Sequence, residues 1–333
     1  MTTKQALPAN LSATYRRYGI LFRVNRGATV SLESGARAAG RFAVQSIWIV
    51  RWSGLVLVLF VTALVSAAQQ NPSPMVEHTR AHPRLEKTVP PGRRIGLELG
   101  TLFIPEKMEP ARQARLLFFF HGGDWIPELA VSKQRNMAVI TVQAGAGSST
   151  YEQLFADPAR FSSLIAAAES TSGLKFGEID LGGWSAGCGA LRKILNDAPS
   201  YDRVNRVLCM DGVHTGYTSG KPGPQESEID TSNLQIWLRL GRDAIAGKKR
   251  LIVTHTEIFP GTFASTTETA DWLLHEWGLT PHPVILWGPM QTQILSDVSE
   301  RGLRVVGFAG NSAPDHVDQL QSLPDFLSWL EEK

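Results

Sequence analysis

Short apolar runs alternate with helical stretches from about residue 93 onwards, and this rhythm limits the fold more than any other feature. The runs are rich in β-branched and aromatic residues, and within each run the apolar residues are continuous. Strands of this kind are buried on both faces, which happens where helices cover a parallel sheet on both sides. We therefore predict an α/β domain over residues 93–333, with a doubly wound, mostly parallel sheet flanked by helices.

The expected elements can be placed by residue number. Predicted strands occupy residues 115–120, 138–142, 178–181, 206–210, 250–254 and 303–308, after a hairpin over residues 95–104. Predicted helices occupy residues 161–170, 186–196, 234–246 and 265–277, and a last helix starts at Pro324. Ligands of doubly wound sheets bind beyond the carboxyl ends of the strands, so reactive groups are expected at that edge.

The N-terminal part of the chain has a different composition. Residues 1–51 hold eight Lys and Arg against one acid, and residues 52–68 carry no charge. The apolar run is too short to cross a bilayer comfortably but suits a signal-peptide core, and small residues follow it where a signal peptidase would cut. We predict a basic leader or mis-assigned start over residues 1–49 and a signal peptide over residues 50–68. The alternative is an uncut membrane anchor over residues 42–66.

The predicted cleavage changes the charge of the protein. Residues 69–92 are rich in proline and are expected to form an extended linker. The whole chain has a formal net charge of +2, from 33 basic and 31 acidic residues; 25 basic and 30 acidic residues follow residue 51. We expect a secreted or periplasmic domain with no nucleic-acid partner, which meets a membrane only if the apolar segment stays uncut. Composition does not indicate the oligomeric state.

A candidate nucleophile lies between a predicted strand and a predicted helix. The segment Gly183-Trp184-Ser185-Ala186-Gly187 has the pattern G-x-S-x-G. In a strand-to-helix turn this pattern holds the serine in a strained conformation with its hydroxyl exposed, and small neighbours let the strand and helix close around it. An unreactive glycine turn is the alternative. We expect Ser185 to be the nucleophile.

A serine nucleophile needs a base and an acid. His316 is the only histidine after the last predicted strand, and we expect it in a loop at the reactive edge, as the general base. Asp211 and Glu257 each follow a strand and fit the chain order serine, acid, histidine. We favour Asp211 because Asp211-Gly212 makes a sharp junction, and keep Glu257 as the alternative acid.

Backbone donors are expected to complete the site. Gly122 and Gly123 end the strand that precedes them, and glycines there let backbone N–H groups approach a ligand oxygen. With the N–H of Ala186 they would form an oxyanion hole, although a simple turn at the end of the strand is the alternative. Nothing in the chain requires a cofactor, and Asp315, His316 and Asp318 are poor support for a metal site.

Five further residues are expected to line a substrate pocket: Trp125, Trp184, His214, Tyr217 and Phe259. For the aromatic ones, a place in the core is an equally good interpretation. A Gly/Pro-rich loop over residues 216–229 and one helix leave only a minimal lid, which disfavours a lipase activated at an interface. Cys188 and Cys209 are expected to be buried, either bonded to each other or free.

Together, the strand ending in His121-Gly122-Gly123, the Gly-Trp-Ser185-Ala-Gly turn and the late His316 resemble the α/β-hydrolase superfamily. The resemblance covers residues 93–333 and implies the α/β-hydrolase fold. It also implies that Ser185 attacks an acyl carbonyl and that water releases the acyl-enzyme. A small-to-medium carboxylic ester is the expected substrate, and a polymer-linked or sugar-linked ester stays open. An acyltransferase or peptidase with the same triad, or a binding protein without turnover, are the alternatives.

Overall fold

The computed structural model describes residues 81–108, 114–220 and 228–332 of the chain. The predicted leader, the predicted signal peptide or anchor, and residues 69–80 of the predicted linker lie outside the described residues. Among the helices that are described, none is both long and apolar enough to cross a membrane.

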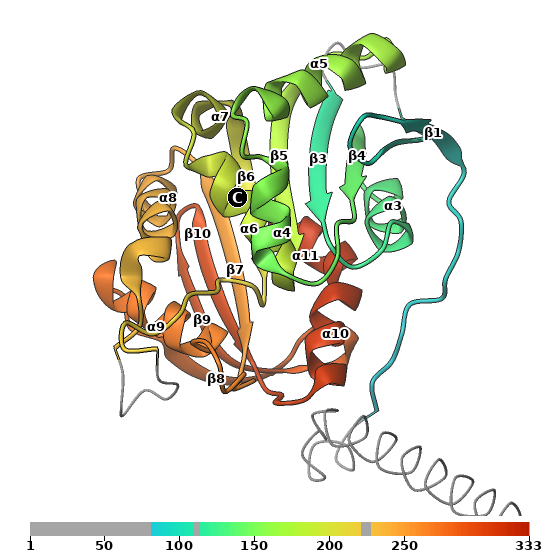
Figure 1. Cartoon of the computed structure of the whole chain (residues 1–333). Coiled ribbons are helices and arrows are strands. Elements are labelled where there is room, and N and C mark those ends of the chain that lie inside the picture. The colour runs from blue at the N-terminus through green and yellow to red at the C-terminus, as the bar shows by residue number, and fades with distance from the viewer. Residues whose placement is uncertain (1–80, 109–113, 221–227, 333) are drawn as a thin grey trace, which may run out of the picture. The chain divides into compact units, whose positions relative to one another are not determined.

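One ten-stranded sheet forms the centre of the described domain, in the order β1-β2-β4-β3-β5-β6-β7-β10-β9-β8 (Figure 1). The strands are β1 (Gly92–Gly96), β2 (Thr101–Pro105), β3 (Ala114–Phe120), β4 (Met137–Val142), β5 (Phe176–Trp184), β6 (Val204–Met210), β7 (Arg250–Thr256), β8 (His282–Trp287), β9 (Gln293–Glu300) and β10 (Leu303–Phe308). Six neighbouring strands run parallel to one another: β4, β3, β5, β6, β7 and β10. Antiparallel pairs extend the sheet at both sides. The predicted mostly parallel sheet is confirmed.

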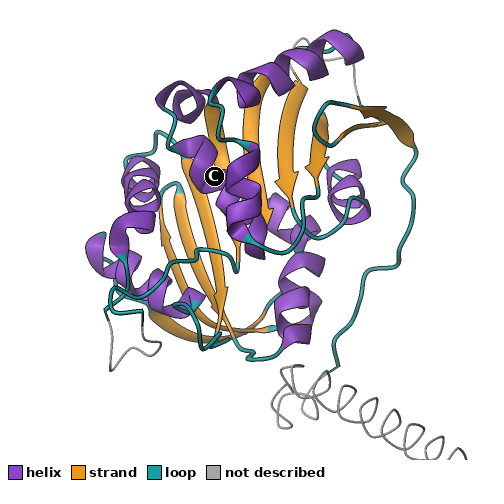
Figure 2. Ribbon diagram, viewed as in Figure 1, coloured by secondary structure: helices purple, strands orange, loops and turns teal. Residues whose placement is uncertain are grey.

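Helices cover both faces of the sheet (Figure 2). They are α3 (Trp125–Ser132), α4 (Ser148–Leu154), α5 (Ala159–Ser172), α6 (Cys188–Leu195), α7 (Ala198–Arg203), α8 (Gln235–Ile245), α9 (Thr266–Glu276), α10 (Ala313–Gln321) and α11 (Leu323–Trp329). One hydrophobic cluster joins the sheet to α5, α6, α8 and α9. A second cluster joins its other face to α3, α10 and α11.

The sequence of β3 explains why both faces need helices. Leu116, Phe118 and Phe120 lie in the first cluster, whereas Leu117 and Phe119 lie in the second, and all five side chains are fully buried. Successive side chains of a strand point to opposite faces, so a continuous apolar run buries both of them. This strand lies in the middle of the sheet, between β4 and β5, and it ends next to β5, the strand that leads to Ser185.

Three regions test the remaining expectations: one is confirmed, and the other two differ. The hairpin over residues 95–104 is confirmed as the antiparallel pair of β1 and β2. The antiparallel strands β8 and β9 were not expected, because β8 is an exposed edge strand without a core pattern. The loop expected around His316 is wrong: His316 lies in α10, which begins at a capping box formed by Ser312 and Asp315.

Candidate active site

The strand-to-helix turn expected around Ser185 is present. Strand β5 ends at Trp184, and Ser185–Gly187 form a 3₁₀ turn that leads into α6. Ser185 has a φ of 51°, a left-handed conformation that is uncommon for a residue with a side chain. Such strain persists only where the surrounding structure imposes it, and it is concentrated at functional sites.

The glycines that flank Ser185 are required by close packing. A Cβ on Gly187 would lie 2.1 Å from the carbonyl oxygen of Phe120, at the end of β3. A Cβ on Gly183 would lie 2.9 Å from the carbonyl carbon of Gly187, so the strand and the helix approach each other within the turn itself. Only glycine fits at either position, which is the physical reason for the G-x-S-x-G pattern here.

Two further strained residues lie at the same edge of the sheet. His121, directly after β3, has a φ of 73°, and Asp211, directly after β6, has a φ of 45°. With Ser185 after β5, these residues follow three neighbouring strands. Strained non-glycine residues therefore gather at the carboxyl edge of the sheet, where ligands of α/β proteins bind.

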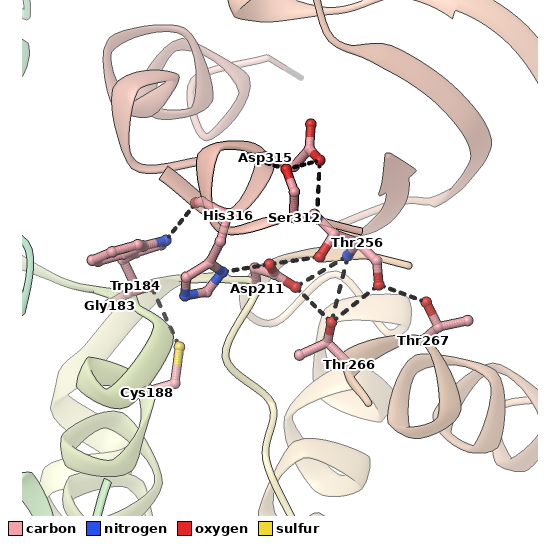
Figure 3. A network of polar contacts seen from close by, with 10 residues as sticks. All are labelled: Gly183, Trp184, Cys188, Asp211, Thr256, Thr266, Thr267, Ser312, Asp315 and His316. Carbon is pink, nitrogen blue, oxygen red and sulfur yellow. Dashed lines mark hydrogen bonds and ion pairs between the residues drawn. The ribbon is translucent and has the colours of Figure 1, made fainter. Parts of the chain in front are cut away.

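Asp211 and His316 form a close pair. The Nδ1 atom of His316 lies 2.6 Å from Oδ2 of Asp211, although 105 residues separate them (Figure 3). Asp211 also accepts hydrogen bonds from the backbone N–H of Thr256 at 3.0 Å, the hydroxyl of Thr256 at 2.7 Å and the hydroxyl of Thr266 at 2.5 Å. Its side chain is thus held from several directions, and only 2% of the residue is exposed.

These contacts set the charge state of Asp211. Burial alone would raise its pKa, but the hydrogen bond and charge of His316 and the hydrogen bonds from Thr266 and Thr256 lower the pKa to about 2. The carboxylate is therefore ionised at neutral pH and can only accept hydrogen bonds. It follows that Nδ1 of His316 carries the proton of this pair, which leaves Nε2 to act as an acceptor when the ring is neutral.

A cavity of about 310 Å³ brings the candidate residues together. It is lined by Ser185, Asp211, His214, Ile258, Pro260, Phe263, Thr266, Ala313 and His316. Apart from the polar groups of the pair and the serine, most of this wall is apolar. Within the part of the chain that the structure describes, Ser185 and His316 share this cavity without a hydrogen bond between them. In ligand-free enzymes such bonds are often long and form only with substrate bound.

Two histidines near Asp211, the partly buried His214 and the buried His255, are neutral at physiological pH. Burial lowers the pKa of His214 to about 4, with the charges of His316 and Arg192 acting in the same direction. Burial also lowers the pKa of His255 to about 4; its Nδ1 lies 3.0 Å from the hydroxyl of Thr267. His214 lines the cavity, where it places an uncharged hydrogen-bonding group beside the His316–Asp211 pair.

Other residues expected in the pocket lie elsewhere. Tyr217 is buried, and its hydroxyl donates to Glu268 at the start of α9. Trp125 is the first residue of α3 and packs against the second hydrophobic cluster. Glu257, the alternative acid, is exposed, and its carboxylate accepts a hydrogen bond from Gly310 rather than from His316. None of these side chains is among those that line the 310 Å³ cavity.

Trp184 has a different position from the one expected. Its indole ring is stacked on His121, with ring centres 5.0 Å apart, and it also lies against the His316 ring, with centres 4.6 Å apart. Its Nε1–H donates to the backbone oxygen of His316 at 2.9 Å (Figure 3). Trp184 therefore connects the serine turn to the helix that carries His316.

The residues expected to supply backbone donors follow the ends of β3 and β5. Gly122 and Gly123 have φ values of 99° and 88°, which suit glycine alone, and they follow His121 in the loop between β3 and α3. A Cβ on Gly122 would lie 2.6 Å from Leu320 of α10 and 3.1 Å from Trp184, so this loop is pressed against both elements of the site. Ala186 follows Ser185 at the start of the 3₁₀ turn, where backbone N–H groups have no partner within the helix.

A disulfide joins two of the elements that carry the site. Cys188, three residues after Ser185, is bonded to Cys209, two residues before Asp211. Both residues are fully buried. The sequence left open whether these cysteines were bonded or free, and the structure has them bonded.

Sequence reasoning missed several residues around the cavity. Ile258, Pro260 and Phe263 lie in the irregular segment between β7 and α9, which has no strand or helix pattern. Thr256 and Thr266, which donate to Asp211, also went unnoticed. For Thr266 a signal was available, since the Ser265–Glu268 capping box starts a helix at the carboxyl edge of the sheet.

Comparison with known proteins yields likenesses in structure only. No protein-family model matches the sequence, and no curated protein matches it. An acetyl xylan esterase from Aspergillus awamori is 13% identical, with 68% of this chain and 93% of that chain covered and a TM-score of 0.40. A poly(3-hydroxybutyrate) depolymerase, LpqC, from Bordetella parapertussis is 12% identical, with 70% of this chain and 85% of that chain covered and a TM-score of 0.41. An alpha/beta hydrolase fold protein from Chitinophaga pinensis is 11% identical, with 76% of this chain and 98% of that chain covered and a TM-score of 0.37.

Likenesses at this level carry no argument about chemistry, and the fold is assigned from the molecule itself. A mostly parallel sheet is covered by helices on both faces. Ser185 occupies a strained strand-to-helix turn within G-x-S-x-G, and a glycine loop after β3 approaches Trp184, the residue before the serine. These features give the chain the fold of the α/β-hydrolase superfamily.

Proposed function

We propose that this protein is a serine hydrolase that cleaves carboxylic esters. The observation that carries the proposal is the shared cavity: Ser185, on its strained turn, and the hydrogen-bonded pair of His316 and Asp211 line the same 310 Å³ space. A nucleophile, a base and an acid that orients the base are the groups that acyl transfer needs.

Each residue has a defined role in the proposed reaction. His316 Nε2 takes the proton of the Ser185 hydroxyl as its oxygen attacks the ester carbonyl. Asp211 holds the imidazole through Nδ1 and stabilises its positive charge. The C–O bond of the tetrahedral intermediate then breaks, and His316 gives its proton to the departing alcohol. Water attacks the acyl-enzyme in the same way, which releases the acid and returns the proton to Ser185.

Backbone donors would stabilise the negative oxygen of the tetrahedral intermediate. The N–H of Ala186 and one from Gly122 or Gly123 are the proposed donors, because these residues lie after Ser185 and in the loop that follows β3. Donors fixed in advance lower the barrier without reorganising during the reaction. No part of this mechanism calls for a cofactor.

The cavity favours a small or medium ester as substrate. Its volume, about 310 Å³, is near the lower end of the range for small-molecule sites. The apolar residues Ile258, Pro260, Phe263 and Ala313 suit an acyl chain, and neutral His214 suits an uncharged polar group. We therefore expect acetyl and butyryl esters to be better substrates than palmitoyl esters.

A panel of p-nitrophenyl esters tests this proposal. The purified protein should hydrolyse the acetate and butyrate much faster than the palmitate, with the free acid as product even when alcohols compete with water. If the acyl group is transferred to the alcohol instead, the protein is an acyltransferase and not a hydrolase. Folded protein that hydrolyses no ester would contradict the proposal.

We also propose that the domain is exported. The predicted signal peptide over residues 50–68 leads into a domain that contains a disulfide, and disulfides persist in oxidising compartments. N-terminal sequencing of the protein recovered from its native cells should give a start near Gln69. A start upstream of residue 50 would favour the uncut anchor instead.

A further inference from the structure

The segment just before β1 is bound to the helix that carries His316. Residues 82–85, here called the N-terminal strap, have no helix or strand structure, and they belong to the proline-rich stretch 69–92 that was predicted to be a linker. The chain runs from β1 along the edge of the domain towards the end that holds α10 (Figure 1). Its polar groups meet those of α10 there, more than 230 residues away in the sequence.

Three contacts define this attachment. Nδ1 of His82 lies 2.8 Å from one carboxylate oxygen of Asp318, and the guanidinium of Arg84 donates to the other oxygen. The backbone N–H of Leu85 donates to the side-chain oxygen of Gln321 at 2.8 Å. The Leu85 side chain packs against the hydrophobic cluster that contains α10 and α11.

The carboxylate at the centre of these contacts is completely buried. Asp318 has 0% of its surface exposed, and it lies two residues after His316 in α10. A buried carboxylate is stable only where positive charge and hydrogen bonds compensate for the loss of water. Arg84 supplies positive charge to this carboxylate from outside the helix, so the strap helps to hold Asp318 at its place inside the domain.

The side chains around Asp318 have the spacing of a metal site, but a positively charged guanidinium already occupies this position. His82, Asp315 and Asp318 each offer one ligand atom, all within 4.8 Å of one another. Arg84 already binds Asp318, and its guanidinium would repel a cation bound to the same carboxylate. The cluster is better explained as an ion-paired anchor.

We propose that Arg84 and His82 are positioning residues, which act through Asp318 to hold α10 so that His316 faces Ser185 and Asp211. This inference rests on the proposed function, since it treats His316 as the base. Helix α10 has a second attachment, in which Trp184 donates to the His316 backbone oxygen. With the strap loosened, α10 keeps that bond but loses the contacts of His82 and Arg84 with Asp318. Small displacements of reacting groups, of about 1 Å, can lower turnover by roughly two orders of magnitude.

The chain offers a matched control for Arg84. Arg94, in β1, binds Glu128 of α3 through Nε, at 3.0 Å from both carboxylate oxygens, and through its Nη2. Arg84 and Arg94 have similar side-chain exposure, 37% and 34%, and both partners are buried carboxylates. Only the partner of Arg84 lies on the helix of His316, so Arg94→Ala reports the effect of losing such an ion pair elsewhere.

The test measures turnover of p-nitrophenyl butyrate and the low-field proton NMR signal of the His316–Asp211 pair, at a temperature where every variant is folded. Arg84→Ala should lower kcat about tenfold or more, with little change in KM, and should shift or broaden the signal. Arg84→Lys, which keeps the charge, should recover much of the loss. Arg94→Ala should lower thermal stability but leave kcat and the signal as in the wild type.

Two results would overturn the inference. One is a folded Arg84→Ala variant with wild-type kcat and signal, and the other is an equal loss of kcat in Arg94→Ala. If Arg84→Ala does not fold, His82→Ala, which removes one bond to Asp318, is measured instead and should show a smaller change in the same direction. If the wild type hydrolyses no ester, the proposed function fails, and the NMR signal still reports whether the strap holds His316.

Discussion

The Nδ1 atom of His316 lies 2.6 Å from Oδ2 of Asp211, while Glu257, the other carboxylate at this edge, is bound to the backbone of Gly310. The two acids follow neighbouring strands, β6 and β7, and the sequence alone leaves both open. The geometry favours one of them as the partner of the proposed base, which leads directly to the first prediction.

Asp211→Asn should lower kcat for ester hydrolysis by about 10³-fold or more, because an amide neither fixes the Nδ1–H form of His316 nor stabilises its positive charge. Glu257→Gln is the matched control and should keep nearly wild-type turnover. Steady-state kinetics of both variants with p-nitrophenyl butyrate show which carboxylate is the acid. A large loss in Glu257→Gln with little loss in Asp211→Asn would reverse the assignment of the acid.

Phe263→Ala should shift the substrate preference towards longer acyl chains. Phe263 lines the cavity and lies edge-on against His214, with ring centres 5.1 Å apart. Its truncation enlarges the space that an acyl chain can occupy, so kcat/KM for octanoate should rise relative to that for acetate.

Phe259→Ala provides the control for this substitution. Phe259 is four residues away in the same segment, is 50% exposed and is not among the residues that line the cavity. The preference of the Phe259→Ala variant among acyl chains should match that of the wild type. An unchanged preference in Phe263→Ala would place the acyl chain elsewhere.

The Cys188–Cys209 disulfide should stabilise the domain without taking part in the reaction. The two cysteines are 21 residues apart, and closing a loop of that length contributes about 3 kcal/mol to the free energy of unfolding. The double variant Cys188→Ala/Cys209→Ala should therefore unfold at a lower urea concentration. A reductant present during unfolding should destabilise the wild type and leave the double variant unaffected; equal responses would argue against the bond.

His255 should make the domain less stable in mild acid. Its pKa is lowered to about 4 in the folded state, against about 6.5 in an unfolded chain, so the unfolded state binds more protons between these values. The free energy of unfolding should therefore fall as the pH decreases from about 6.5, by about 3 kcal/mol at pH 4 from this residue alone.

His255→Gln removes this titration. Urea unfolding measured from pH 7 to pH 4 should give a shallower pH dependence for His255→Gln than for the wild type. His275→Gln, at an exposed position on α9, controls for the loss of a histidine as such. If His255→Gln and the wild type lose stability in parallel, His255 does not supply the acid sensitivity.

Much of the fold could be predicted because its central strands are explicit in the sequence. The β3 run from Leu116 to Phe120 is apolar at every position, which fixes both its burial and the helices on either side. The β8 and β9 pair could not be predicted in this way. Its outer strand has mostly exposed side chains, including Ile285 and Trp287, so no alternation of buried and exposed residues marks it.

In the candidate site, too, some features could be predicted from the sequence and others could not. Ser185, His316 and Asp211 could be predicted to meet, because each follows a strand of one parallel sheet; their catalytic role stays a prediction. The position of Trp184 between His121 and His316 depends on how α10 packs against the serine turn. The binding of the strap to Asp318 joins segments more than 230 residues apart, and no local pattern in either one indicates the other.

Labelling with a fluorophosphonate tests the central claim most directly, because the probe reacts with an activated serine whatever the natural substrate is. Mass spectrometry of the wild-type protein should find the phosphonate on Ser185, and Ser185→Ala should abolish the labelling while Ser148→Ala, a serine at the start of α4, leaves it intact. Folded wild-type protein that stays unlabelled, or labelling that persists in Ser185→Ala, would contradict the assignment of Ser185 as the nucleophile.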